Sequence, residues 1–277
     1  MSNKPSNVLL LVVTILLGLA SVPLVLMYVY LLVDTFTDTR AGEWLPHAFT
    51  LAHWHFLWQD LPGRPNIWTV ALNTLLFAST TTLLVVVISS AAAYTLSRMD
   101  IPLRGFFLGG VMVLHAFPTV TLLIATFLIL QYIGLYDTLP GVILVKASLE
   151  LPFGIWILKG FYDQVPWEIE MAAIQDGASR FRVWREIVLP LVRPALLPLA
   201  IFSFLAGWSE YLLPQVLAPG NHAQVLSVYL AGLIADDNNY DMATFKAVGL
   251  FYAAPVMILF IVFQKQLMNM YSGGNKG

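Results

Sequence analysis

The sequence predicts an all-α membrane protein with six transmembrane helices, folded as a single domain over residues 1–277. Of the 277 residues, 58% are hydrophobic and 11% are charged, and the mean hydropathy is +0.77. A soluble globule of this composition would have too little polar surface to cover itself, so the lipid bilayer is the expected surrounding. The net charge of −2 comes without a basic arm or stripe, which argues against nucleic acid as a partner.

Six apolar runs approach the roughly 20 residues that a membrane-spanning helix needs. They cover residues 8–33, 68–96, 106–130, 141–159, 192–215 and 247–267. The first run is longer than the apolar part of a signal peptide and has no convincing cleavage site, so we expect a retained helix. The fourth run contains Lys146 and Glu150, whose i,i+4 spacing places them on one helical face, where they could pair.

Loop charges predict the orientation, because Lys and Arg gather in cytoplasmic loops. Of the 14 Lys and Arg residues, Lys146 lies in a span, and Arg40, Arg64 and Lys246 lie on one side. The remaining ten lie on the other side: Lys4, Arg98, Arg104, Lys159, Arg180, Arg182, Arg185, Arg193, Lys265 and Lys276. We therefore expect both termini and the loop 160–191 in the cytoplasm, with the loops 34–67, 131–140 and 216–246 outside.

The loop 160–191 is expected to form two short helices. In the first, steps of about 100° place Trp167, Met171 and Ile174 on one face, and Ile169, Ala172, Ala173 and Asp176 on the opposite face. Gly177 can end this helix in the left-handed conformation, Ser179 can cap the second helix, and Pro190 is expected to close it. Such a segment could lie on lipid headgroups. The small Ala172-Ala173 face favours the alternative, a docking surface for another protein.

The spacing in this loop resembles the cytoplasmic EAA loop of ABC-importer permeases. That pattern is Glu-Ala-Ala, three residues, Gly, nine residues, Ile, one residue and Leu-Pro, and it is matched by Ala172, Ala173, Gly177, Ile187, Leu189 and Pro190. The run from Asp176 to Ser179 is similar to the form found in the carbohydrate branch. Met171 stands where the family has its Glu, and the sequence leaves open whether the neighbouring Glu170 takes over.

Shorter matches extend the resemblance to maltose and trehalose permeases along most of the chain. They are Asn73-Thr74, Ala92-Ala93-Tyr94 with Arg98, Phe117-Pro118, Gly134 to Thr138, Trp208 to Tyr211, and the tail from Gly273 to Gly277. The resemblance implies a permease subunit of an ATP-driven, binding-protein-dependent sugar importer in a bacterial inner membrane. A cytoplasmic coupling helix would then lie between the fourth and fifth membrane helices.

The resemblance also implies partners: a second permease subunit, two ATPase subunits and an external sugar-binding protein. The helix from Trp167 to Gly177 would enter a cleft on the ATPase. The residues expected to couple the two proteins are Glu170, Met171, Ala172, Ala173, Asp176, Gly177, Ile187, Leu189 and Pro190. This chain has no GxxxxGK[ST] phosphate loop, so ATP and Mg²⁺ are expected on the ATPase, and the chain itself is expected to be neither an enzyme nor a cofactor carrier.

Aromatic and polar side chains inside the spans are the expected sugar contacts. Trp208, Glu210 and Tyr211 come first, followed by Asn73 and His115. The alternative is that the partner permease carries most sugar contacts, with Trp208 or Tyr211 only packing and Glu210 making a structural hydrogen bond at the outer mouth. By resemblance, the outer loop 216–246 would face the binding protein, unless it is simply solvated. The contacts expected there are Asp236, Asp237, Asn238, Asn239 and Tyr240.

Two other classes of function stay open at this point. One is a stand-alone secondary transporter driven by an ion gradient, with Lys146, Glu150 and Glu210 as a charged relay. The other is a membrane-embedded enzyme or assembly factor. No metal site is expected at His53-Trp54-His55, where only His47 lies nearby, and the absence of Cys excludes disulfides and thiolate ligands.

Overall fold

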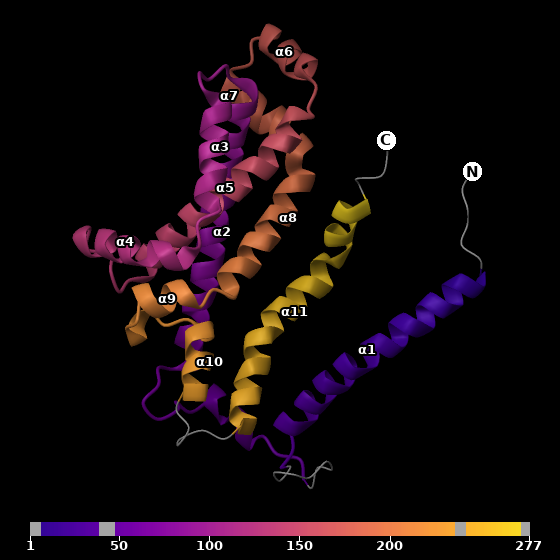
Figure 1. Cartoon of the computed structure of the whole chain (residues 1–277), viewed down its shortest axis with the longest axis vertical. Helices are drawn as coiled ribbons and strands as arrows, with labels where there is room; N and C mark the ends of the chain where they lie inside the picture. The colour runs from indigo at the N-terminus through magenta and orange to yellow at the C-terminus, as the bar shows by residue number, and fades with distance from the viewer. Residues whose placement is uncertain (1–6, 39–47, 236–241, 273–277) are drawn as a thin grey trace.

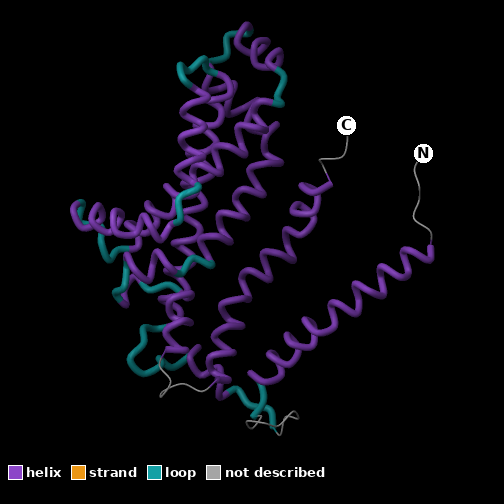
Figure 2. The backbone as a smooth tube through the Cα atoms, in the orientation of Figure 1, coloured by secondary structure: helices purple, strands orange, loops and turns teal. Residues whose placement is uncertain are grey.

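The computed structural model describes residues 7–38, 48–235 and 242–272, and these are mostly helical (Figure 2). Within these ranges the one extended pairing is an isolated bridge between Thr37 and Phe49. Long apolar stretches form helices in a membrane because every backbone N–H and C=O must be hydrogen-bonded internally. The predicted all-α membrane fold is confirmed.

Five helical segments of the described chain are long and apolar enough to cross a bilayer. Four are α1 (Asn7–Thr35), α2 (Ile67–Arg98), α5 (Leu139–Asp163) and α11 (Met242–Ser272). The fifth is a continuous run of α7 (Arg180–Val183), a π-helical turn (Trp184–Val188) and α8 (Leu189–Trp208). The predicted spans 8–33, 68–96, 141–159 and 247–267 are therefore found, each extended at its ends.

The predicted third span, 106–130, is not one continuous helix. It divides into α3 (Arg104–His115) and α4 (Thr119–Tyr132), and α4 projects sideways from the bundle (Figure 1). Pro118 is the reason, because proline disfavours helical backbone in the residue before it and has no N–H to continue the ladder. The predicted count of six continuous spans is not confirmed.

The helix through Pro190 also differs from the prediction. Ser179 caps α7 as expected, since its hydroxyl oxygen accepts a hydrogen bond from the backbone N–H of Arg182 at 3.3 Å. Pro190 does not close the helix, however. The preceding turn widens so that the N–H of Leu189 donates to the carbonyl of Trp184, five residues back. A π turn of this kind lets the proline ring fit inside a continuing helix.

Shorter helices join the spans. α6 (Trp167–Gln175) lies beyond the ends of α5 and α7, at the upper end of the bundle in Figure 1. At the opposite end lie η1 (Ala52–Leu57) and α10 (Leu226–Ala235). α9 (Leu212–Leu217) lies near α4, and η3 (Asn221–Ala223) connects α9 to α10 and contacts the turn at Asp137. We call these two ends the α6 end and the α10 end. The predicted span 192–215 stops at Trp208 because the chain turns there before α9.

α2 is the central helix and packs against both α5 and α8. Small residues allow the close approach: a Cβ on Gly154 of α5 would lie 2.5 Å from the Ser89 hydroxyl, and a Cβ on Gly207 of α8 would lie 3.0 Å from the Ala78 Cα. Such small-residue contacts are typical of helix pairs in lipid. α1 stands apart (Figure 1) and meets α11 near the ion pair of Asp34 with Lys246, 2.7 Å.

Candidate functional site: an anchored surface helix and an intramembrane charge cluster

α6 ends as the sequence predicted. Gly177 has φ +89°, in the left-handed region that favours glycine. The N–H of Gly177 donates to the carbonyl of Ile174, and the N–H of Ala178 donates to the carbonyl of Ala173, both at 3.0 Å. This pair of hydrogen bonds is a Schellman motif. It fixes the direction in which the chain leaves α6 for α7.

The two faces of α6 have different surroundings. Ile169, Ala172 and Asp176 are exposed, whereas Ala173 and Ile174 pack against a buried apolar cluster that includes Val183. The sequence placed Ala172 and Ala173 on one face. Ala172 is exposed, whereas Ala173 is partly buried against the cluster, so the two do not share one environment. The exposed side of α6 includes Ile169, Ala172 and Asp176.

Glu170 is buried and anchors α6 to α2. Its side chain is 2% exposed and forms an ion pair with Arg98, whose Nε donates to Oε1, while the Tyr94 hydroxyl donates to Oε2 at 3.1 Å. The Arg98 guanidinium also donates to the carbonyl of Val165 at 2.6 Å and lies 5.6 Å from the centroid of the Trp167 ring. Removing one partner of a buried pair leaves an uncompensated charge, at a cost of about 3–5 kcal/mol.

Two further contacts tie the same end of α2 to its neighbours. The Ser90 and Tyr162 hydroxyls share a hydrogen bond of 2.7 Å, and the Trp184 indole N–H donates to Tyr162 at 3.1 Å. The Ser97 hydroxyl donates to Asp163 at 2.6 Å. The C-terminal part of α2 is therefore bonded to α5 and to α6, and Tyr162 of α5 is bonded in turn to the π turn after α7.

The other residues expected to couple α6 to a partner have mixed exposure. Met171, in the position of the family's Glu, is partly buried, as are Ile187 and Leu189, while Pro190 is exposed. Sequence reasoning missed Arg98 and Tyr94 as partners of Glu170. The available signal was an Arg ending an apolar span, together with an acid in the first turn of a short helix on the same side of the membrane.

A second group of charged side chains joins α5 to the turn that follows α8. The Lys146 ammonium is 2.7 Å from Glu210 and 3.2 Å from Glu150, and the three side chains are 13–16% exposed. The predicted Lys146–Glu150 pairing is thus confirmed, with Glu210 as an additional partner. Glu210 also accepts a hydrogen bond from the N–H of Leu213 at 3.2 Å. With one cation and two carboxylates, the cluster carries one excess negative charge when all three are ionised.

The remaining residues proposed for the substrate path are not gathered in one place. Trp208 is 3% exposed and its indole N–H donates to the Tyr252 carbonyl at 3.1 Å. The Asn73 amide donates to the carbonyls of His222 and Gln224. His115 stacks on Phe153 with ring centroids 6.0 Å apart, and Tyr211 is 43% exposed. Trp208 and Asn73 are thus occupied by contacts within the chain, whereas His115 and Tyr211 keep exposed surface.

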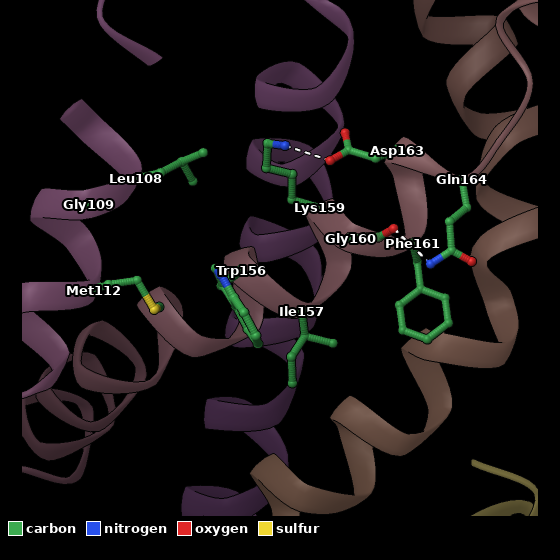
Figure 3. A pocket seen from close by; sticks show the side chains of 10 residues that line it. All are labelled: Leu108, Gly109, Met112, Trp156, Ile157, Lys159, Gly160, Phe161, Asp163 and Gln164. Carbon is green, nitrogen blue, oxygen red and sulfur yellow. Dashed lines mark hydrogen bonds and ion pairs between the residues drawn. The ribbon is translucent and has the colours of Figure 1, made fainter. Parts of the chain in front are cut away.

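A cavity of about 520 Å³ lies between α3 and α5, near the α6 end (Figure 3). Leu108, Met112, Trp156 and Ile157 are among the residues lining it, and the Lys159–Asp163 ion pair, 2.6 Å, lies at one edge. None of the five residues proposed for the substrate path lines this cavity. Its wall is largely apolar, which gives a sugar few hydrogen-bond partners.

Two further expectations concern contacts with the binding protein and metal binding. The proposed binding-protein contacts Asp236, Asp237, Asn238, Asn239 and Tyr240 lie outside the described residues. Within the described ranges, no group of three or more His, Asp or Glu side chains is arranged to hold a metal ion.

Long apolar helices, a charge cluster inside them and a small helix anchored at one end define a multi-pass membrane transport subunit. The chain belongs to the family described as the binding-protein-dependent transport system inner membrane component, whose model matches residues 85–267. This membership argues against a stand-alone secondary transporter and against an enzyme. The matched region begins within α2 and leaves out α1.

Curated relatives match between 74% and 95% of the chain. The diacetylchitobiose uptake system permease protein NgcG of Streptomyces coelicolor is 31% identical, covering 94% of this chain and 86% of that protein. The trehalose transport system permease protein SugB of Mycobacterium tuberculosis is 28% identical, covering 95% of both chains. The maltodextrin transport system permease protein MdxG of Bacillus subtilis is 32% identical, covering 74% of both.

A solved structure shows the same fold. A chain of a bacterial ABC transporter that imports the acidic polysaccharide alginate superposes with a TM-score of 0.79 over 96% of this chain and 98% of that chain, at 23% identity. A second structure of a bacterial alginate ABC transporter, in complex with an alginate pentasaccharide-bound periplasmic protein, gives a TM-score of 0.67 over 91% of this chain and 92% of that chain, at 20% identity.

Proposed function

We propose that this chain is the membrane-spanning permease subunit of an ATP-driven sugar importer. The observation that carries the proposal is the family match together with relatives named for chitobiose, trehalose and maltodextrin uptake. The shared chemistry of those cargoes is that of a neutral or N-acetylated oligosaccharide. A second permease subunit, two ATPase subunits and an external binding protein would complete the importer, with ATP and Mg²⁺ bound on the ATPase.

α6 is the proposed coupling helix. Among its exposed residues, Ile169, Ala172 and Asp176 lie within two turns of one another, and the small Ala172 allows close approach by a cleft on the ATPase. Its opposite face is fixed to the bundle through Glu170. A helix held on one side and free on the other can transfer the movement of a partner to the membrane helices. Closure of the ATPase dimer would then switch the importer between two packed states.

The α6 end is proposed to face the cytoplasm, together with both chain termini. The excess of Lys and Arg on this side supports this orientation. The helix directions agree with it, because the first residues of α1 and the last residues of α11 both lie toward the α6 end (Figure 1). The α10 end and the segment 236–241 would then face the binding protein.

For the sugar path, we propose His115 and Tyr211 as contacts of this subunit, with the Lys146–Glu210 pair as a further polar group. Aromatic faces and charged hydrogen-bond partners are the groups that recognise sugars, and His115 and Tyr211 keep exposed surface. Replacing Tyr211 with Ala should raise the KM for sugar uptake with little change in expression. Unchanged KM and kcat would argue against this part of the proposal.

The central test is assembly and cargo binding. The chain should be co-expressed with its ATPase, second permease and binding protein, once these are identified, and the ATPase should co-purify with it. Ala172→Trp should reduce co-purification, whereas Phe181→Trp, an exposed position on α7, should not. Binding of a sugar panel to the cognate external protein would identify the cargo. An ATPase that fails to co-purify with the unmodified chain would refute the proposal.

A further inference from the structure

The contacts of α2 connect the two ends of the molecule. At the α6 end, Arg98 and Tyr94 bind Glu170. At the α10 end, Asn73 donates to the carbonyls of His222 and Gln224 at 3.0 and 3.1 Å. One helix therefore contacts both the proposed coupling helix and the segment that leads into α10.

The contact at the α10 end, like the one at the α6 end, includes a hydrogen bond made by a buried side chain. The Thr74 side chain is 1% exposed, and its hydroxyl oxygen accepts a hydrogen bond from the N–H of Leu226 at 2.8 Å, at the first residue of α10. On its other side, the segment is held by the turn at Asp137, whose carboxylate accepts from the N–H of Gly220 at 2.7 Å. Segment 220–226 thus has two fixed attachments, and α2 supplies one of them.

α2 lacks the residues at which helices usually bend. It contains neither Pro nor Gly over its 32 residues, whereas α1, α5, α8 and α11 each contain at least one Pro. Sharp kinks in helices occur mainly at these residues. At 1.5 Å per residue, the 25 steps from Asn73 to Arg98 span about 38 Å. This is close to the full thickness of a bilayer, about 40–45 Å.

We propose that α2 carries the movement of α6 to segment 220–226, with Glu170 and Arg98 as positioning residues that fasten α6 to it. This inference rests on the proposed function, because it assumes that an ATPase moves α6. Glu170 therefore acts inside the permease and does not contact the ATPase itself. Chain connectivity already links α6 to α5 and α7; the buried ion pair adds the link to α2.

The absence of Cys from the chain makes a direct test possible. Asn221 is exposed in the segment held by α2, so Asn221→Cys provides one thiol whose labelling rate reports on that end. The assembled importer is labelled with a maleimide, with and without ATP, and the permease band is quantified. ATP should change the labelling rate by about 5-fold or more, the lower range of allosteric coupling between sites. The same rate in both conditions would overturn the proposal.

Three variants of the Asn221→Cys chain then locate the link. Glu170→Gln, which removes the charge and keeps the shape, should abolish the ATP-dependent change while the ATPase still co-purifies. The double change Asn73→Ala/Thr74→Val removes the three hydrogen bonds from α2 to segment 220–226. It should do the same from the opposite end of α2 and leaves α6 untouched. Glu186→Gln is the matched control, because its ion pair with Arg182 is exposed and contributes little; it should keep the full ATP response.

The outcomes separate this inference from the function on which it rests. Loss of the ATP response in both Glu170→Gln and Asn73→Ala/Thr74→Val, with the ATPase bound, supports α2 as the link. An ATP response that persists in either variant overturns the inference and leaves the permease assignment intact. If Glu170→Gln does not assemble, Asn73→Ala/Thr74→Val decides alone. An ATPase that does not bind the unmodified chain refutes the proposed function instead.

Discussion

The charge cluster of Lys146, Glu150 and Glu210 allows a quantitative prediction. Replacing Lys146 with Met leaves two carboxylates without a cation in a site where the side chains are 13–16% exposed. Removing one partner of a buried pair costs about 3–5 kcal/mol, and the residual exposure favours the lower end of that range. We therefore expect Lys146→Met to lower the free energy of unfolding by about 3 kcal/mol.

The two glutamates should behave differently from Lys146 and from each other. In Glu150→Gln, Lys146 keeps the shorter contact, 2.7 Å to Glu210, and the cluster becomes neutral. Its free energy of unfolding should change by less than about 1 kcal/mol, as for a weakly contributing pair. In Glu210→Gln, the 3.2 Å contact to Glu150 remains. The expected loss is intermediate, about 1–2 kcal/mol on the same scale.

The assay is denaturant unfolding of the purified importer in detergent, followed by tryptophan fluorescence, for the three single variants and the double variant Lys146→Met/Glu210→Gln. The double variant should recover part of the loss in Lys146→Met, because one buried carboxylate is removed with the lysine. If Glu150→Gln is as unstable as Lys146→Met, or the double variant is no better than the single one, the pairing scheme is wrong.

Three further predictions concern backbone positions and the segment outside the described ranges. Gly177→Val forces a branched residue to φ +89°, which costs about 1–2 kcal/mol of backbone strain. The variant should transport less sugar per ATP hydrolysed, and normal uptake would argue against α6 as a lever. Gly207→Leu should lower the thermal unfolding midpoint, because the new Cβ would lie only 3.0 Å from the Cα of Ala78. Gly249→Leu is the control, because a Cβ at Gly249 would have no neighbouring atom within 4 Å. Deleting residues 236–241 should reduce transport with ATPase binding intact, and unchanged transport would exclude a role in cargo release.

Much of the fold followed from local patterns in the sequence. Apolar length located four of the spans, and helical spacing placed Lys146 beside Glu150. Gly177 and Ser179 were assigned correctly as helix end and cap because both roles depend on the local backbone alone. The interruptions were harder to predict. Pro118 breaks a helix and Pro190 does not, since the outcome depends on whether a neighbouring turn can widen, which is a matter of tertiary packing.

The site was predicted less completely, for the same reason. Side-chain type made Glu170 a candidate for contact with a partner, but its actual partners, Arg98 and Tyr94, are more than 70 positions away in the sequence. Trp208 and Asn73 had suitable chemistry for binding a sugar. Only their contacts with Tyr252 and His222 show that their polar groups are already engaged within the chain. Long-range pairing of this kind leaves no periodic signal in a single sequence.

The separation of 72 positions between Arg98 and Glu170 has a consequence for biogenesis. A ribosome adds about 5–20 residues per second, so roughly 4 to 14 s pass between the synthesis of the two residues. During that interval Arg98 is a cation at the end of a newly inserted helix, where it favours cytoplasmic placement of that end. When Glu170 arrives, the same charge becomes part of a buried pair. In the proposed orientation, Arg98 would serve first as a topological signal and later as one half of a buried ion pair. Its replacement would then affect membrane insertion as well as the finished transporter.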